Sequence, residues 1–335
     1  MAGGEERHGV PLTNLDQPLL GDAGPTKRDL VDYLDAMADR VIPELAGRPL
    51  SVIRVLRGQK PFMQKNLSSY APDWIKTFKA WTETSKREIA YPLCEDRRTL
   101  VWLANQRAVE YHPTLMRMSQ WGHATHLVLD IDPPAVDDRE VKDAPDEQDS
   151  LKAFAAAVKA AFLVRDVLEQ AGLAGVVKTS GAKGIHVFVP LDEDTTVDDA
   201  AAATRALAAR AERLDPALVT TAFIREDRGG KVFLDSSRAG GATVVAVYSP
   251  RVRPGLPVSF PLDWNDVDRV HPADFTIRNV AGLLGDRNPW VELMPEPQRL
   301  SDDLVQEGHA IPVARVQAMH EGKRRARARR EAKKS

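Results

Sequence analysis

Residues 121–135 read Trp-Gly-His-Ala-Thr-His-Leu-Val-Leu-Asp-Ile-Asp-Pro-Pro-Ala. The apolar residues of 127–131 favour a β-strand, and the prolines at 133–134 end it because proline cannot donate to a sheet ladder. Asp130 and Asp132 are two residues apart, so both carboxylates face the same side of an extended strand. The stretch therefore predicts a strand that presents two acids at its end.

Two neighbouring carboxylates repel each other, so the pair requires a cation nearby. Oxygen ligands suit Mg²⁺ or Mn²⁺. An Asp-x-Asp pair is also common at a solvated strand end, and on this motif alone a metal site and a pair of surface acids are equally open.

Composition narrows the class of protein. The chain has 335 residues, 43% of them hydrophobic, and a formal net charge of −2, so composition alone does not indicate nucleic-acid binding. Length allows one large domain or two. The single cysteine, Cys94, excludes an internal disulfide and a multi-cysteine zinc site. No signal peptide or run of 18 apolar residues is present, so we expect a soluble, cytoplasmic protein that associates with the nucleoid.

The expected elements alternate between helices and strands. Apolar periodicity and helix caps predict four helices, at 26–37, 95–110, 150–171 and 196–214. Apolar runs predict strands at 50–56, 86–91, 127–132, 174–179, 185–191, 220–224, 231–235 and 242–248, and residues 136–149 read as an acidic loop. This order predicts an α+β fold with helices on one side of an antiparallel or mixed sheet.

A glycine-rich turn follows the central acids. Residues 178–186 read Lys-Thr-Ser-Gly-Ala-Lys-Gly-Ile-His, and the glycines leave backbone N–H groups free to face an anion. Ser180 adds a hydroxyl donor, Lys183 adds a positive charge, and His186 projects from the next strand. The alternative is a plain hairpin turn.

Two further segments carry candidate residues for chemistry. Asp235 ends an apolar strand as the central acids do. Arg251 and Arg253 share a face if the chain is extended there, and could grip phosphates by bidentate pairing. The alternative for the arginines is a surface salt-bridge pair.

The basic segments are candidates for contact with nucleic acid. A loop at 57–66 places Lys65 and other cations beside Phe62, which suits a phosphate backbone and a stacked base, although such a loop is more often plain surface. Lys27 lies at a helix start, where an anionic ligand would account for a cation. Residues 323–335 hold eight Lys or Arg and one Glu, and this tail fits either DNA capture or solubility.

Three acids, a Gly-Lys-His turn and an Arg-x-Arg segment form the inventory of metal-assisted nucleotidyl transfer. In that chemistry one metal activates a 3′-hydroxyl nucleophile, and a second holds the triphosphate and stabilises the leaving pyrophosphate. Cationic side chains neutralise the charge that develops on the phosphoryl oxygens.

These motifs resemble a known family. The segments 127–133, 179–186 and 233–235 resemble motifs I, II and III of the archaeo-eukaryotic primase superfamily. The flanking sequences are closer still to the polymerase domain of the bacterial end-joining ligase LigD and to its stand-alone actinobacterial relatives of the Prim-PolC type. The matching flanks are 12–16, 25–29, 248–258 and 261–264. The resemblance covers about residues 11–284, and we expect the stand-alone form because no ligase or nuclease domain is recognisable.

The resemblance implies an RRM-like catalytic core and a set of site residues. Two Mn²⁺ or Mg²⁺ ions would be bound by Asp130, Asp132 and Asp235. The triphosphate would contact Ser180, Lys183, His186, Arg251 and Arg253, the nucleotide sugar would lie by His112, and DNA would contact Lys27, Phe62 and Lys65. The chain departs from the end-joining members at Gln17, where they carry lysine, and this weakens the expectation of a 5′-phosphate pocket.

The family's activity sets the functional hypothesis. It implies template-directed gap filling on primed or gapped DNA, with a preference for ribonucleotides over deoxyribonucleotides and with priming as a further activity, in excision repair or end joining. A separate DNA ligase or Ku would be partners of a monomeric enzyme. The alternative is a catalytically inactive nucleic-acid-binding module, against which the retention of all three acids argues.

The expected domain organisation is simple. Residues 1–9 would be disordered, and 10–300 would form one primase-polymerase domain. Its N-terminal α/β part would span 10–120 and its catalytic core 121–300. Residues 301–335 would be a C-terminal extension that ends in the basic tail.

Overall fold

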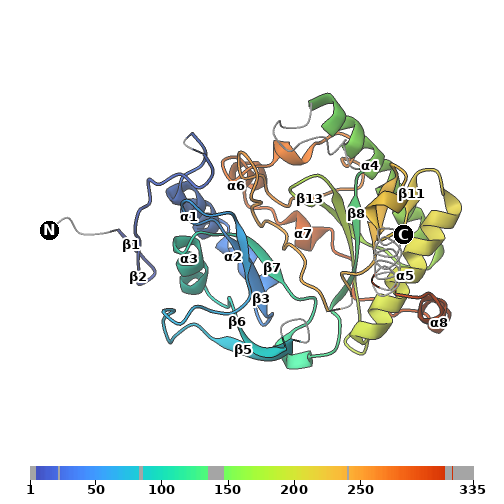
Figure 1. Cartoon of the computed structure of the whole chain (residues 1–335), viewed down its shortest axis with the longest axis horizontal. Coiled ribbons are helices and arrows are strands. Elements are labelled where there is room, and N and C mark those ends of the chain that lie inside the picture. The colour runs from blue at the N-terminus through green and yellow to red at the C-terminus, as the bar shows by residue number, and fades with distance from the viewer. Residues whose placement is uncertain are drawn as a thin grey trace, which may run out of the picture.

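The computed structural model shows two parts of the chain lying side by side, each with its own sheets (Figure 1). Helices and antiparallel and mixed sheets together confirm the predicted α+β class. The predicted basic tail, and most of the predicted acidic loop, lie outside the described residues. The structure describes residues 5–21, 23–82, 86–134, 147–239, 241–313 and 319.

A six-stranded sheet forms the centre of the larger part. Its order is β11 (Val219–Thr220), β12 (Val232–Asp235), β8 (His126–Asp132), β10 (Ile185–Pro190), β9 (Val176–Thr179) and β13 (Pro261–Leu262). Neighbouring strands are antiparallel except for β11 and β12, which are parallel. The strand predicted at 220–224 is limited to β11, and β11 and the strand predicted at 231–235 do not form a hairpin, because parallel neighbours cannot be joined by a tight turn.

Helices cover the apolar face of this sheet. Leu127, Leu129 and Ile131 alternate along β8 with the acidic residues and are fully buried. Helices α4 (Glu147–Gln170) and α5 (Val197–Leu214) contact β8 from one side, and α8 (Asp302–Ala310) packs on α5 (Figure 1). The acids consequently lie on the opposite face, toward the N-terminal part. No helix among the described residues has the length and apolar character needed to cross a membrane.

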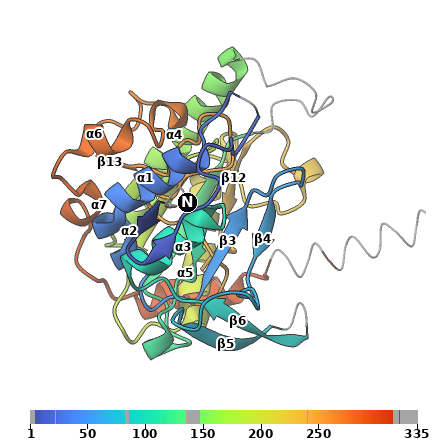
Figure 2. The same cartoon turned by 90° about the vertical axis from the view of Figure 1, so that its left-hand side faces the viewer.

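The N-terminal part is built from smaller sheets and helices. Strand β3 (Leu50–Arg54) lies between β4 (Phe62–Gln64) and β7 (Ala108–Pro113), and β5 (Thr77–Thr82) and β6 (Arg87–Pro92) form a separate ribbon (Figure 2). Three helices pack together beside β7: α1 (Lys27–Ala36), α2 (Ala38–Leu45) and α3 (Arg97–Asn105). Thr26 caps α1 through a capping box with Asp29, which confirms the predicted helix start.

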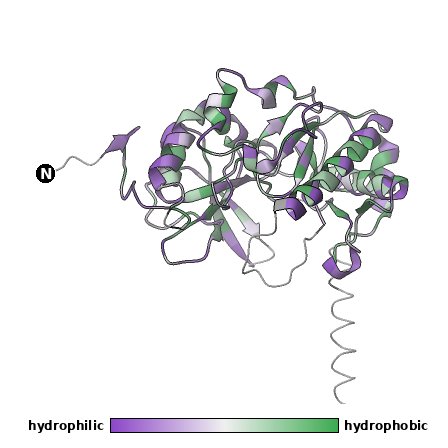
Figure 3. Ribbon diagram, turned by 90° about the horizontal axis from the view of Figure 1, so that it is seen from above, coloured by the Kyte–Doolittle hydropathy of each residue, from purple (hydrophilic) through white to green (hydrophobic). Residues whose placement is uncertain are grey.

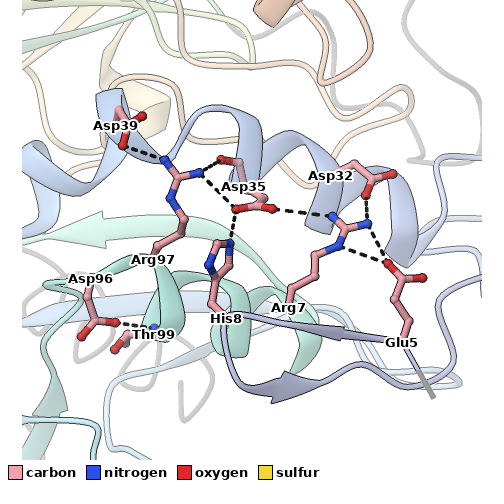
Figure 4. A network of polar contacts seen from close by, with 9 residues as sticks. All are labelled: Glu5, Arg7, His8, Asp32, Asp35, Asp39, Asp96, Arg97 and Thr99. Atoms are coloured by element: carbon pink, nitrogen blue, oxygen red, sulfur yellow. Dashed lines mark hydrogen bonds and ion pairs between the residues drawn. The ribbon is translucent and has the colours of Figure 1, made fainter. Parts of the chain in front are cut away.

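Ion pairs fasten a short hairpin, β1 (Glu6–Arg7) and β2 (Val10–Pro11), to α1 (Figure 4). The network includes Arg7–Asp32 at 2.6 Å, His8–Asp35 at 2.9 Å and Arg97–Asp39 at 2.7 Å. Exposed ion pairs contribute about 0–1 kcal/mol each. The network therefore orients the hairpin, while the buried apolar residues stabilise the fold. Figure 3 shows hydrophobic and hydrophilic residues alternating along the helices.

Residues 243–250 join the two parts. Their backbone runs along β7, where Ala246 N donates to Tyr111 O at 2.9 Å, and the Tyr33 hydroxyl donates to the carbonyl of Tyr248 at 2.7 Å. The predicted strand at 242–248 does not form, apart from one isolated bridge at Thr243. Tyr248 has a φ of 62°, a left-handed conformation that interrupts a ladder.

Other boundaries also differ from the predictions. The helix expected at 95–110 ends at Asn105, because Arg107 takes a φ of 63°, and Glu110 therefore lies on β7. Helix α4 begins at Glu147 rather than at Ser150. The end of the described chain holds the short helices α6 (Val280–Leu284) and α7 (Pro289–Glu292) before α8.

Candidate active site

A row of polar side chains crosses the central sheet perpendicular to its strands. Lys178 on β9 lies opposite His186 on β10, which lies opposite Asp130 on β8, which lies opposite Asp235 on β12. Directly opposite residues share one face of a sheet. The strand order therefore brings together residues from three separate sequence motifs, and Asp132 follows Asp130 on the same face.

His186 is held in one tautomer by its neighbours. Burial and the Lys178 charge lower the pKa of His186 to about 4, so the ring is neutral near pH 7. Nε2 of His186 lies 3.2 Å from Asp130 Oδ1, and because an ionised carboxylate can only accept, the ring proton resides on Nε2 and is donated to Asp130. Nδ1 of His186 then accepts from Lys178 Nζ, which lies 2.9 Å away.

Lys178 is itself fixed. Its side chain is fully buried, and Nζ donates to Ser259 Oγ at 2.6 Å. Burial and the Arg251 charge lower the pKa of Lys178 well below its ordinary value. The buried amine of Lys178 thus donates to His186 and fixes the orientation of its ring.

Arg238, which follows β12, contacts two of the three acids. Its Nε lies 3.0 Å from Asp130 Oδ2 and 3.3 Å from Asp235 Oδ2. Burial acts to raise the pKa of Asp130, but His186 and Arg238 more than offset burial, and the pKa falls below its ordinary value. The Ser237 amide donates to the second oxygen of Asp235 at 2.8 Å.

Asp132 has the opposite electrostatic environment. Burial and the charges of Asp130 and Asp235 raise its pKa to about 7. Among the described residues it forms no hydrogen bond or ion pair, so its negative charge has no direct counter-ion. A carboxylate in this environment is suited to accept a cation, because a cation would relieve the repulsion from both neighbours.

The three acids supply the chemistry that a hard divalent cation requires. Their carboxylate oxygens are the ligands that Mg²⁺ and Mn²⁺ prefer. In the described part of the chain, no group of three or more His, Cys, Asp or Glu side chains is already arranged to hold a metal ion. Arg238 engages one oxygen of Asp130 and one of Asp235, and a metal ion bound by these acids would use the same kind of oxygen.

A second buried cluster lies on β7 beside the row. Glu110 Oε2 lies 2.8 Å from His112 Nε2 and 3.0 Å from Arg251 Nε, and Oε1 accepts from the Val252 amide at 2.7 Å. Burial acts to raise the pKa of Glu110, but these three partners lower it to about 2. Glu110 therefore fixes both His112 and Arg251, two residues that the sequence assigned to the nucleotide site.

The arginine segment is not extended, so the condition under which Arg251 and Arg253 would share a face is not met. Arg253 N donates to Arg251 O at 2.8 Å, a tight turn that directs the two side chains differently. Arg251 also donates to the carbonyl of Ser180, while Arg253 is exposed. Arg251 thus orients the glycine turn, and the guanidinium of Arg253 remains accessible.

The glycine turn also differs from its predicted form. Ser180 Oγ accepts from the amides of Ala182 at 3.2 Å and Gly184 at 3.0 Å, so these N–H groups are not free for an anion. Gly181 has a φ of 68°, and a Cβ there would lie 2.7 Å from Ser259 N. The glycine therefore allows close approach of the 258–259 backbone, and it leaves Lys183 exposed at the tip of the turn.

A cavity of about 360 Å³ opens next to Asp132. Four cationic side chains line it. Lys183 comes from the glycine turn, and the segment before β12 supplies Arg225, Arg228 and Lys231. Arg228 stacks on Phe233, with its guanidinium carbon 3.7 Å from the ring centroid. The cavity thus combines one acid with strong positive charge, as a polyanionic ligand requires.

A second pocket, of about 770 Å³, lies in the N-terminal part between residues 14–21 and the 55–61 loop. Arg107 lines it and donates to the carbonyl of Pro18 at 2.7 Å and to Gln17 Oε1 at 3.4 Å. Burial and the Arg107 charge lower the pKa of Lys27 to about 8. Three cations, Arg57, Arg107 and Lys27, therefore lie near Gln17, where the sequence lacks the lysine of the end-joining members.

The predicted DNA-contacting residues differ in exposure. Lys27 is buried and donates to the carbonyl of Thr13, so it is not available as a surface cation in this conformation. Phe62 is exposed at the edge strand β4 and Lys65 is partly exposed just after it. Phe62 lies on a different sheet from the acids, and Lys27 and Lys65 lie on neither sheet.

Sequence reasoning assigned no role to Glu110, Lys178, Arg228 or Arg238. Lys178 stands two residues before Ser180 and could have been found from strand alternation. Glu110 likewise stands two residues before His112 on β7, so the two side chains share one face of the strand. The shared face was missed because the sequence predicts a helix that includes Glu110. Arg238 carries no sequence signal, since its partners come from strands β8 and β12.

The fold and the acid-histidine row define a primase-polymerase of the archaeo-eukaryotic primase superfamily. Residues 26–290 match the family model described as "LigD, primase-polymerase domain", and the chain belongs to this family of nucleotidyltransferase polymerases. This confirms the resemblance, the fold class and the enzyme class expected from the sequence.

Individual relatives agree. The multifunctional non-homologous end joining DNA repair protein LigD of Mycobacterium tuberculosis H37Rv is 34% identical over 275 residues, which cover 77% of this chain and 33% of the relative. The bifunctional LigD of Bacillus subtilis is 31% identical over 304 residues, 87% of this chain and 46% of the relative. The chain thus spans between a third and a half of the length of these relatives.

A solved structure supports the same conclusion. The polymerase domain of Mycobacterium tuberculosis Ligase D in complex with DNA superposes with a TM-score of 0.74 at 31% sequence identity. The match covers 87% of this chain and 98% of that one. The similarity therefore extends over nearly the whole of a LigD polymerase domain.

Proposed function

We propose that this protein is a DNA-directed polymerase that fills short gaps during DNA repair. The observation that carries the proposal is the row of His186, Asp130 and Asp235 beside a cationic cavity that also contains Asp132. Acids placed at the edge of a cationic cavity can hold the reacting end of a polyphosphate while the cations bind the rest of it.

The incoming nucleotide would be bound by residues from several elements. Lys183 and Arg253 are exposed and would contact the phosphates directly. His112 and Arg251, fixed by Glu110, would line the sugar and phosphate side. Because Glu110 and the surrounding backbone hold these groups before substrate arrives, less ordering is needed on binding.

Asp130, Asp132 and Asp235 would hold the divalent ions, which we propose are two Mn²⁺ or Mg²⁺. Bound there, the ions would activate a 3′-hydroxyl and stabilise the charge on the phosphates. His186 would keep Asp130 ionised and oriented, because its Nε2 proton is committed to that carboxylate.

The DNA would lie between the two parts of the chain and reach the N-terminal pocket. Phe62 could stack on a base, and Lys65, Arg57 and Arg107 could contact phosphates. Arg107 beside Gln17 would compensate for the missing lysine, so a 5′-phosphate at the far side of a gap remains a suitable ligand.

The names of the relatives point to end joining, and the solved neighbour was determined with DNA. We propose a role of this kind for the present chain, in end joining or excision repair, acting as a monomer in the cytoplasm at the nucleoid. A preference for ribonucleotides, a priming activity, and a ligase or Ku as partner complete the proposal.

Incorporation of labelled nucleotide on a gapped duplex, with and without Mn²⁺, tests the proposed function. The wild type should extend the primer across the gap, with ribonucleotides used at least as well as deoxyribonucleotides. Asp130→Asn should abolish extension, whereas Asp263→Asn, at a half-buried turn outside the row, should not. Binding without extension by the wild type would instead support the inactive nucleic-acid-binding module.

A further inference from the structure

Arg238 provides the direct cationic partner of the acid cluster within the described residues. Its Nε bridges Asp130 and Asp235 at 3.0 and 3.3 Å, and its side chain is 39% exposed. Its remaining guanidinium nitrogens form no hydrogen bond with described residues. Among the described residues, the acids alone therefore anchor this side chain, and it is partly open to solvent.

The oxygens of the acids are largely occupied by protein groups. Asp130 is engaged by His186 on one oxygen and by Arg238 on the other. Asp235 is engaged by the Ser237 amide and by Arg238. A divalent ion that uses Asp130 and Asp235 together therefore competes with Arg238 for the same oxygens.

The charge balance favours an exchange of cations. With Arg238 in place, three carboxylates share one directly paired guanidinium, and Asp132 lacks a direct partner. A divalent ion carries twice the charge of a guanidinium and could satisfy Asp132 as well. Removal of Arg238 without a replacement would leave the acids to repel each other.

Resting on the metal site of the proposed function, we propose that Arg238 is an internal counter-cation that closes the acid cluster in the metal-free protein and is displaced when a divalent ion binds. Arg238 thus sets the apparent metal affinity, acting as a positioning residue rather than a metal ligand. Apparent affinity scales with the fraction of open sites, so a fivefold change in affinity corresponds to a closed state in about four of every five molecules.

The test uses Mn²⁺ alone, without nucleotide or DNA. Free Mn²⁺ is measured by electron paramagnetic resonance during titration of the full chain. Arg238→Gln should bind Mn²⁺ about fivefold tighter than the wild type or more. The control Arg269→Gln makes the same chemical change at an exposed arginine paired with Asp266, outside the acid cluster, and should bind as the wild type does.

Equal or weaker Mn²⁺ binding by Arg238→Gln would overturn the inference. Failure of both the wild type and Arg238→Gln to bind Mn²⁺ would overturn it together with the proposed metal site. If the wild type binds Mn²⁺ and the variant binds it no more tightly, only the inference about Arg238 fails, and the proposed metal site stands.

A second measurement requires no folded variant. In ¹⁵N-labelled wild type, the Arg238 Nε–H resonance reports its hydrogen bonds to Asp130 and Asp235. Titration with Mg²⁺, which is diamagnetic, should shift this resonance to the position of a solvated arginine. A resonance that does not move at saturating Mg²⁺ would show that Arg238 stays in place, contrary to the proposal.

Discussion

Outside the acid row, Glu110 is the buried carboxylate that we expect to contribute most to the folding stability of the protein. Its partners His112, Arg251 and the Val252 amide lower its pKa from an ordinary 4.5 to about 2. A difference of about 2.5 in pKa, at 1.36 kcal/mol for each unit, corresponds to about 3 kcal/mol of folding free energy. The side chain is only 5% exposed, so little of this is lost to solvent screening.

The pH dependence has a definite sign. Because the folded-state pKa lies below the unfolded value, the stabilisation is present above about pH 4.5 and is lost as the pH falls toward 2. Glu110→Gln keeps the shape and can still accept from the Val252 amide, but it carries no charge. At pH 7 the variant should be less stable by on the order of 3 kcal/mol, and the difference should shrink progressively below pH 4.5.

Urea unfolding of wild type and Glu110→Gln at several pH values between 7 and 3 measures the difference directly. Glu292→Gln is a matched control, because Glu292 also pairs with an arginine and accepts a backbone amide, from Asn288, but at the surface. It should change stability far less. A gap between wild type and Glu110→Gln that is the same at pH 3 and pH 7 would refute the electrostatic argument, as would no gap at pH 7.

The remaining predictions concern the glycine turn. Lys183→Ala should raise the KM for nucleotide and lower kcat in steady-state extension assays, because its contact strengthens as charge builds on the phosphates; wild-type kinetics would leave the turn without a role in nucleotide binding. Gly181→Ala should destabilise the fold by about 1–3 kcal/mol in urea titrations, since its Cβ would meet Ser259 N at 2.7 Å and φ is 68°. Gly229→Ala, with φ of 58° but no atom within 4 Å of its Cβ, isolates the backbone strain, and an equal loss in both variants would contradict the close-approach argument.

The sequence alone was sufficient to predict those helices and strands whose formation depends on residues close together in the chain. The alternation of 127–132 predicted β8 with both acids on one face, and Thr26 and Thr196 predicted the starts of α1 and α5. Such features arise from side-chain direction and from capping within a few residues, so they are readable without the fold. The motif order was also sufficient to indicate the family.

The arrangement of the site was decided by tertiary structure. The row of Lys178, His186, Asp130 and Asp235 exists because β9, β10, β8 and β12 are neighbours in one register, and no local pattern contains that register. Arg238 likewise meets Asp130 across 108 positions of sequence. Local pattern failed at Glu110 as well, because the left-handed Arg107 ended the expected helix and placed Glu110 on β7 against Arg251. Contacts between distant segments depend on how the strands pair and how the chain turns between them, and these are properties of the folded chain as a whole.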